Sequence, residues 1–166
     1  HGGKNVNFKR YQFLRDRALE KLRAQDLSRP MVEAPATVQG EDSLMLAYIG
    51  DALYSLFVRQ RLIGTGIDKV RVLHALVTEF ICAKAQSAAL LALEPKLTEA
   101  ELAVAKRARN SHVNVPKSAT VQEYRASTAF EALLGYLSRT GQEARLQEIM
   151  TAAFEITLAA INTPVK

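Results

Sequence analysis

The chain has 166 residues, of which 48% are hydrophobic and 23% charged, with a formal net charge of +5 and a pI near 9.5. This composition is typical of an ordinary globular domain and excludes a fibrous or intrinsically disordered chain. Arg59, Glu79 and Lys84 interrupt the apolar runs before the roughly 20 residues needed to cross a bilayer, so we expect no membrane span.

The cysteine content indicates a reducing compartment. Cys82 is the single cysteine of the chain and has no partner for an internal disulfide. Such chains are typical of the cytoplasm, and the apolar neighbours of Cys82 predict a place in the core and not a reactive thiol.

The positive charge is unevenly distributed and indicates a polyanionic partner. Residues 1–29 carry eight Lys or Arg against three Asp or Glu, which accounts for the whole surplus. The remainder is neutral on average but has two local basic segments, over residues 59–71 and 105–125. A solvated helix face explains either segment equally well, so each is only a candidate for contacts with nucleic-acid phosphates.

In chain order, the first predicted element is an amphipathic helix over Phe8–Asp26, with apolar residues on one side and Arg or Lys elsewhere. Residues 28–40 contain Pro30, Pro35 and Gly40 and are expected to be a connection. We therefore interpret residues 1–40 as an N-terminal extension and residues 41–166 as the main domain.

Helical patterns continue through the main domain, and no segment has a convincing strand pattern. Helices are predicted over residues 41–63, 68–78 with Asp68 as N-cap, 79–93, 98–109, 121–140 and 143–161. Thr98 and Glu101 form a predicted capping box, and residues 110–120 read as a polar loop. The predicted fold class is all-α.

Two lone acids stand out within apolar helical runs. Asp51 is the only acid between Leu44 and Ile63, where Ala47, Asp51, Ser55 and Arg59 recur four apart, and the apolar residues Leu46, Ile49, Leu53, Leu56, Phe57 and Leu62 form the other face. Glu131 is the only acid between Ser127 and Leu137, and it also has small neighbours. An unpaired carboxylate among apolar groups is costly, whereas a shared divalent cation would stabilise both. The alternative is that each acid lies at the edge of a solvated face.

Gly50 adds to this interpretation. Glycine within a helix costs roughly 1 kcal/mol relative to alanine, so its presence next to Asp51 predicts that another backbone approaches closely.

The same residues carry a resemblance. The heptapeptide YIGDALY at Tyr48–Tyr54 resembles the signature helix of the ribonuclease III superfamily, and FEALLGYL at Phe130–Leu137 resembles its second catalytic helix. That family usually has two further acids, at positions held here by Ala47 and Thr128. The same departure, with RNS, VPK and YRASTAFE between Arg109 and Glu131, is similar to the Mini-III ribonucleases.

This resemblance implies a ribonuclease III-like catalytic domain that forms a homodimer, cleaves double-stranded RNA and lacks a separate RNA-binding domain. It also implies a role in maturing the precursor of large-subunit ribosomal RNA. Asp51 and Glu131 would be the catalytic residues and would hold Mg²⁺, with Mn²⁺ as a substitute. With only two acids, we expect metal binding in the millimolar range or weaker until RNA is bound.

Without an appended domain, the RNA contacts would come from the basic segment and polar loop near the catalytic cleft. The candidate RNA-binding residues are Lys106, Arg107, Arg109, Asn110, Ser111, His112, Lys117 and Arg125. An A-form groove is recognised mainly through its backbone and 2′-hydroxyls, so these contacts should be sensitive to salt more than to sequence. Two alternatives remain open: a non-catalytic RNA-binding or ribosome-assembly module, and a helical protein-binding adaptor.

Overall fold

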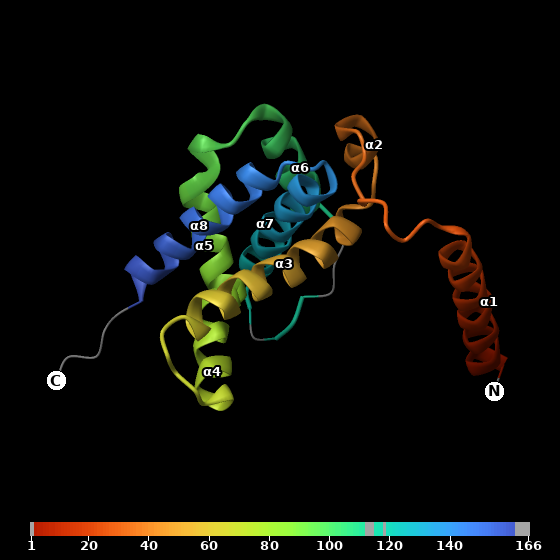
Figure 1. Cartoon of the computed structure of the whole chain (residues 1–166), viewed down its shortest axis with the longest axis horizontal. Helices are drawn as coiled ribbons and strands as arrows, with labels where there is room; N and C mark the ends of the chain where they lie inside the picture. Colours follow the sequence, from red (N-terminus) through yellow and green to blue (C-terminus); the bar gives the residue numbers. More distant parts are fainter. Residues whose placement is uncertain (1, 112–114, 118, 162–166) are drawn as a thin grey trace. The chain divides into compact units, whose positions relative to one another are not determined.

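The computed structural model describes residues 2–111, 115–117 and 119–161, which contain helices and no strands, confirming the all-α class. The helices are α1 (Gly2–Ala24), α2 (Pro35–Gln39), α3 (Ser43–Ile63), α4 (Val70–Ile81), α5 (Ala83–Leu93), a 3₁₀ turn η1 (Glu94–Lys96), α6 (Glu99–Arg109), α7 (Val121–Arg139) and α8 (Glu143–Ala160) (Figure 1).

The chain divides into two compact units, residues 1–31 with α1 and residues 32–166 with all the other helices. The expected connection over residues 28–40 contains α2, which begins with Pro35 and buries Val38 completely. Proline suits the first position of a helix because its φ is already near the helical value. The segment before α3 is also held by a hydrogen bond from Glu33 N to Arg139 O at 2.8 Å and by an ion pair between Arg139 and Glu41.

Helix α7 is the centre of the second unit, because α3, α5, α6 and α8 all pack against it (Figure 1). Every residue from Ala126 to Leu137 is buried except Glu131, which is half-buried. A helix that is buried on all sides needs no polar face, which explains the continuous apolar run in this part of the sequence.

Aromatic side chains form the core beside this helix. Tyr54 packs edge-on against Phe130 with ring centroids 5.0 Å apart, and Phe57 lies parallel to Tyr54 at 6.3 Å. Phe154 of α8 contacts Phe57 and stacks on Phe80 at 4.4 Å. The central segment of α3 is therefore fixed against α4, α7 and α8 by aromatic packing.

The helices around Cys82 differ from the prediction. Lys69, not Asp68, is the N-cap residue of α4, and the helix continues to Ile81. Cys82 has ψ 155°, which interrupts the helix between α4 and α5. It is half-buried at this break and does not belong to the core as predicted, because its backbone changes direction at the edge of the packed helices.

Helices α6 and α7, which lie on either side of the polar loop, both begin with a capping box. Thr98 and Glu101 bond each other's backbone N–H groups as predicted, and Thr120 and Glu123 form a second box at the start of α7 that the prediction missed. Each box satisfies backbone donors that a helix N-terminus otherwise leaves unpaired.

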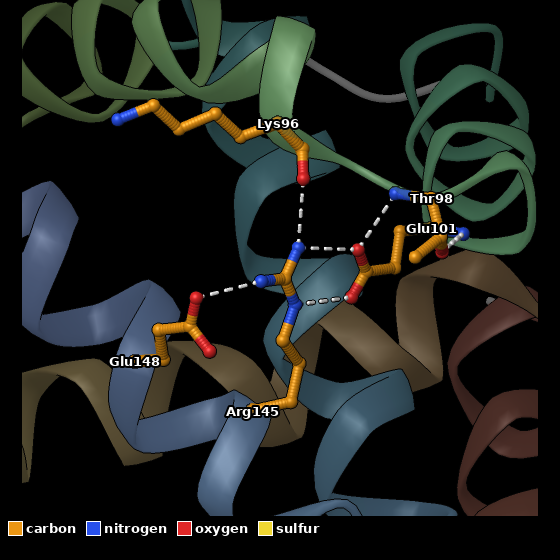
Figure 2. A network of polar contacts seen from close by, with 5 residues as sticks. All are labelled: Lys96, Thr98, Glu101, Arg145 and Glu148. Atoms are coloured by element: carbon orange, nitrogen blue, oxygen red, sulfur yellow. Dashed lines mark hydrogen bonds and ion pairs between the residues drawn. The ribbon is translucent and has the colours of Figure 1, made fainter.

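Glu101 also takes part in the network that joins α6 to α8 (Figure 2). Arg145 donates to both carboxylate oxygens of Glu101 at 3.0 and 2.9 Å, to Glu148 at 2.9 Å and to the backbone oxygen of Lys96 at 2.9 Å. Burial tends to raise the pKa of Glu101, but the bonds from Arg145 and Thr98 outweigh it and hold that pKa below its usual value. The network fixes the start of α6.

In the described part of the chain, no single helix has the length and apolar character of a membrane span. The pair formed by α4 and residues 83–96 reaches that length and composition only when both are taken together, with a bend of 44° between them.

Candidate active site

The crossing of α3 and α7 depends on two glycines. A Cβ placed on Gly50 would lie 1.7 Å from the carbonyl oxygen of Glu131, and a Cβ on Gly135 would lie 2.0 Å from the carbonyl oxygen of Leu46. No side chain fits such gaps, so the two backbones are in direct contact at both points. This confirms the close approach predicted from Gly50. Because residues 46 and 50 meet 135 and 131 in reverse order, the helices run antiparallel here.

This contact brings the two lone acids together. Asp51 follows Gly50, whose Cα faces the Glu131 backbone, and the carboxyl groups of Asp51 and Glu131 are within hydrogen-bonding reach of each other. Asp51 is exposed and Glu131 is half-buried. We refer to these two residues as the acid pair; 79 residues separate them in sequence, and only folding places them side by side.

The surroundings of Glu131 change its acidity. Burial, the hydrogen bond with Asp51 and the negative charge of Asp51 raise the pKa of Glu131 to about 9. At neutral pH, Glu131 therefore holds a proton that a cation would have to displace. Strongly perturbed carboxyl groups of this kind cluster at functional sites, although they also occur in structural pairs.

Ala47 and Thr128 hold the two positions at which the resemblance implies further acids, and both have ordinary packing roles here. Ala47 is buried, and the hydroxyl of Thr128 donates to the carbonyl oxygen of Tyr124 at 3.0 Å. Ser127 donates to the same oxygen at 2.8 Å. Within the described ranges, no group of three or more His, Cys, Asp or Glu side chains is arranged to hold a metal ion. Among the described residues, the carboxyl groups at this crossing are therefore those of the acid pair.

The basic residues predicted to contact RNA are partly brought together. Arg109, Asn110 and Arg125 line one hollow with Gln122, and Arg109 and Asn110 also line an adjacent hollow with Lys106. Arg109 already donates to Glu94 at 2.6 Å, an ion pair that sequence reasoning missed because fifteen residues separate the partners. We call these two adjoining hollows the basic hollow.

The other described residues that were predicted to bind RNA do not line this hollow. Arg107 and Lys117 are exposed, and the hydroxyl of Ser111 donates to the carbonyl of Arg107 at 3.2 Å, while His112 lies outside the described residues. Arg125 precedes Glu131 by six residues on α7, which places it about 9 Å away along the axis and about a third of a turn around it. The basic hollow therefore lies to the side of the acid pair.

One face of α3 beside the acid pair is exposed and apolar. Met45, Tyr48, Leu56 and Ile63 are 57, 80, 55 and 63% exposed, respectively. The prediction that Leu56 belongs to the buried face was wrong, because the apolar surface of α3 is wider than the part covered by α7 and α4. The buried residues of α3, which include Leu46, Tyr54, Phe57, Val58 and Leu62, lie towards the core.

Comparison with known proteins identifies the family. Residues 44–142 match the model of the ribonuclease III domain, a range that contains both helices of the acid pair. The chain belongs to the ribonuclease III family. Within this family it is 50% identical to a Mini-ribonuclease 3 of Symbiobacterium thermophilum, over 66% of this chain and 85% of that protein, and 47% identical to one of Brevibacillus brevis, over 68% and 85%.

A solved structure agrees with this ribonuclease III assignment. The crystal structure of a Fusobacterium nucleatum protein matches with a TM-score of 0.65 and 31% identity, over 69% of this chain and 93% of that one. Membership in the family makes the chain an endoribonuclease, a hydrolase that cuts RNA internally.

Proposed function

We propose that the chain is a homodimeric, Mg²⁺-dependent endonuclease specific for double-stranded RNA, with the acid pair as its catalytic centre. The observation that carries this proposal is the direct backbone contact at Gly50, which places Asp51 beside Glu131. Two lone acids from helices distant in sequence converge at one exposed point, within the range that matches the family.

The donor set of the acid pair fits Mg²⁺. Mg²⁺ prefers six oxygen ligands and is commonly held by one or two carboxylates together with water and substrate phosphate. Asp51 and Glu131 supply hard oxygens of this type, and Mn²⁺ accepts the same ligands. When bound, such an ion supplies a water of lowered pKa and stabilises negative charge on the leaving oxygen.

The residues of the chain have separate tasks around this centre. Glu131 holds a proton in the metal-free state and must release it to act as a ligand. Asp51, which is exposed, faces the side from which a duplex backbone can approach. The basic hollow then provides phosphate contacts, with Lys106 and Arg125 as exposed cations and Arg109 available once it leaves Glu94.

The exposed apolar face of α3 supports the homodimer. Met45, Tyr48, Leu56 and Ile63 lie on one side of α3 at helical spacing, with the exposed Arg59 between the last two. Exposed apolar patches commonly mark protein interfaces. A twofold contact between two copies of this face would place two acid pairs near one duplex. Replacing Tyr48 with Lys should therefore shift the protein to monomers in sedimentation, and an unchanged mass would exclude this face.

The substrate proposed within the cell is the precursor of large-subunit ribosomal RNA, in the cytoplasm. This part of the proposal comes from the resemblance to Mini-III ribonucleases, and its support is the identity of 50% to a Mini-ribonuclease 3. Accumulation of an uncut precursor in cells that produce only an Asp51→Asn variant would test it.

The deciding experiment is a cleavage assay. Duplex RNA is incubated with Mg²⁺ or with EDTA and with wild type, Asp51→Asn, Glu131→Gln and a control, Glu155→Gln, which removes an exposed acid of α8. We expect cleavage only by wild type and control, only with Mg²⁺, and retained RNA binding by both active-site variants. Binding without cleavage by every form would instead support a non-catalytic RNA-binding module.

A further inference from the structure

Helix α1 lies outside the range that matches the family, which begins at residue 44, and forms a compact unit of its own within residues 1–31. Residues 1–31 hold eight Lys or Arg and three Asp or Glu, a surplus equal to the net charge of +5 of the whole chain. The unit with the acid pair therefore has no net charge. A unit without net charge has little long-range attraction for a polyanion, although the basic hollow can contact phosphates locally, so the net positive charge that attracts RNA over longer distances lies on α1.

Three of the seven cations of α1 are arranged along one stripe. Arg10, Arg17 and Lys21 are separated by seven and four residues, which places them on the same side of a helix over about 16 Å of its axis. All three are exposed. Among the described residues of this unit, the ion pairs are Arg15 with Asp16 and Arg29 with Asp26, and neither involves the stripe.

An aromatic ring lies at the edge of this basic stripe. Phe13 is three residues after Arg10 and four before Arg17, and it is 58% exposed. Exposed aromatic rings among cations are typical of surfaces that bind nucleic acid, where the cations contact phosphates and the ring stacks on a base that a duplex leaves unpaired, at an end or a bulge.

The apolar face of α1, which adjoins the basic stripe, is poorly suited to a lipid surface. Phe8, Tyr11, Leu14 and Leu22 are exposed apolar residues on one face, but Arg15 lies in their midst, seven residues from both Phe8 and Leu22. A helix that lies in a membrane interface has its charges confined to the polar face. The interrupted apolar face and the uninterrupted basic stripe together favour a polyanion in water.

We propose that α1 is an RNA-binding helix that contacts the phosphates of the duplex through Arg10, Arg17 and Lys21 and thereby raises the affinity of the neutral catalytic unit for its substrate. This inference rests on the proposed function, because the RNA that α1 would bind is the duplex cleaved at the acid pair. Residues 25–34 tether α1 to α2. Such a short tether keeps the helix at high effective concentration near a duplex already engaged by the acid pair.

The test is duplex RNA binding by the full chain in EDTA, where the RNA stays intact, measured by fluorescence anisotropy at several salt concentrations. In Arg10→Gln/Arg17→Gln/Lys21→Gln, affinity at 0.1 M salt should fall by at least about tenfold, and the slope of log affinity against log salt should decrease by up to about 2.7, or 0.9 for each phosphate. The control Lys69→Gln/Lys84→Gln/Lys96→Gln removes three exposed cations of the catalytic unit and should change both values much less.

Three outcomes would overturn the inference: unchanged affinity in the α1 variant, an equal loss in the control, or binding to anionic phosphatidylglycerol vesicles that depends on the stripe while RNA binding does not. Arg10→Lys/Arg17→Lys keeps the charge and should retain affinity, which separates lost contacts from a damaged helix. The control variant should cleave duplex RNA at the wild-type rate. If no form cleaves, the proposed function fails, but the binding result still decides the role of α1.

Discussion

The replacement Gly50→Ala tests whether the backbone contact between α3 and α7 creates the acid pair. The new Cβ would lie 1.7 Å from the carbonyl oxygen of Glu131, whereas ordinary contacts begin at 3.4 Å, so the helices must separate by about 1.7 Å at this point. Glu131 O belongs to the backbone of a buried helix and cannot turn away. In an isolated helix the same change would be favourable by about 1 kcal/mol.

The expected net effect is a loss of both stability and activity. Overpacking of this kind costs about 1–3 kcal/mol and sometimes more, which exceeds the gain in helix propensity. A net loss of about 2 kcal/mol would lower the Tm by roughly 5–10 °C in a unit of this size. Because Asp51 is the next residue, a displacement of more than 1 Å should reduce cleavage by about two orders of magnitude.

Thermal melting and single-turnover cleavage of duplex RNA measure the two effects. Gly40→Ala is the matched control, since Gly40 has φ −81° and its Cβ would lie 3.4 Å from the carbonyl oxygen of Thr37. The control should melt at or slightly above the wild-type temperature and cleave normally. A Gly50→Ala protein with wild-type stability and activity would refute the idea that main-chain contact positions the acids.

Three further predictions concern charge. Mg²⁺ affinity measured by calorimetry should rise by up to about tenfold per pH unit below pH 9, with release of one proton, because binding must displace the proton of Glu131; a pH-independent affinity would contradict this. Glu94→Gln frees Arg109 and should strengthen duplex binding and increase its salt slope by about 0.9, whereas weaker binding would show that the ion pair itself shapes the basic hollow. Arg145→Met leaves the buried carboxylate of Glu101 without its partner and should cost about 3–5 kcal/mol in urea unfolding. Since the folded pKa of Glu101 is lowered, this stabilisation is present above its unfolded pKa and should disappear as the pH falls through the folded value; a difference that persists in acid would point to packing instead.

The local features of this fold could be predicted because their causes are local. The capping box at Thr98 and Glu101 depends on residues three apart, and the helix that carries Asp51 depends on the periodicity of its own apolar residues. Gly50 also gave a correct prediction, because a glycine that weakens its helix implies a compensating contact elsewhere.

The features that sequence reasoning missed depend on which surfaces meet. Leu56 has the periodicity of a core residue, yet it is exposed because none of the helices described within residues 32–161 covers that part of α3. The pair Arg109 and Glu94 and the burial of Val38 also arise from contacts between segments distant in sequence. Periodicity predicts that a residue can be buried, but only packing determines what covers it.

The raised pKa of Glu131 explains how the proposed site can exist without a metal ion. The folded chain binds a proton there up to about pH 9 while the unfolded chain loses it near 4.5, so the stability of the metal-free protein falls as the pH rises between these values. The proton removes the repulsion between the two carboxylates. A cation displaces this proton only when its binding free energy exceeds the cost of deprotonating Glu131. With two protein ligands, that condition is best met when RNA phosphate adds its own oxygens. Metal and RNA should therefore each increase the affinity for the other by the same factor.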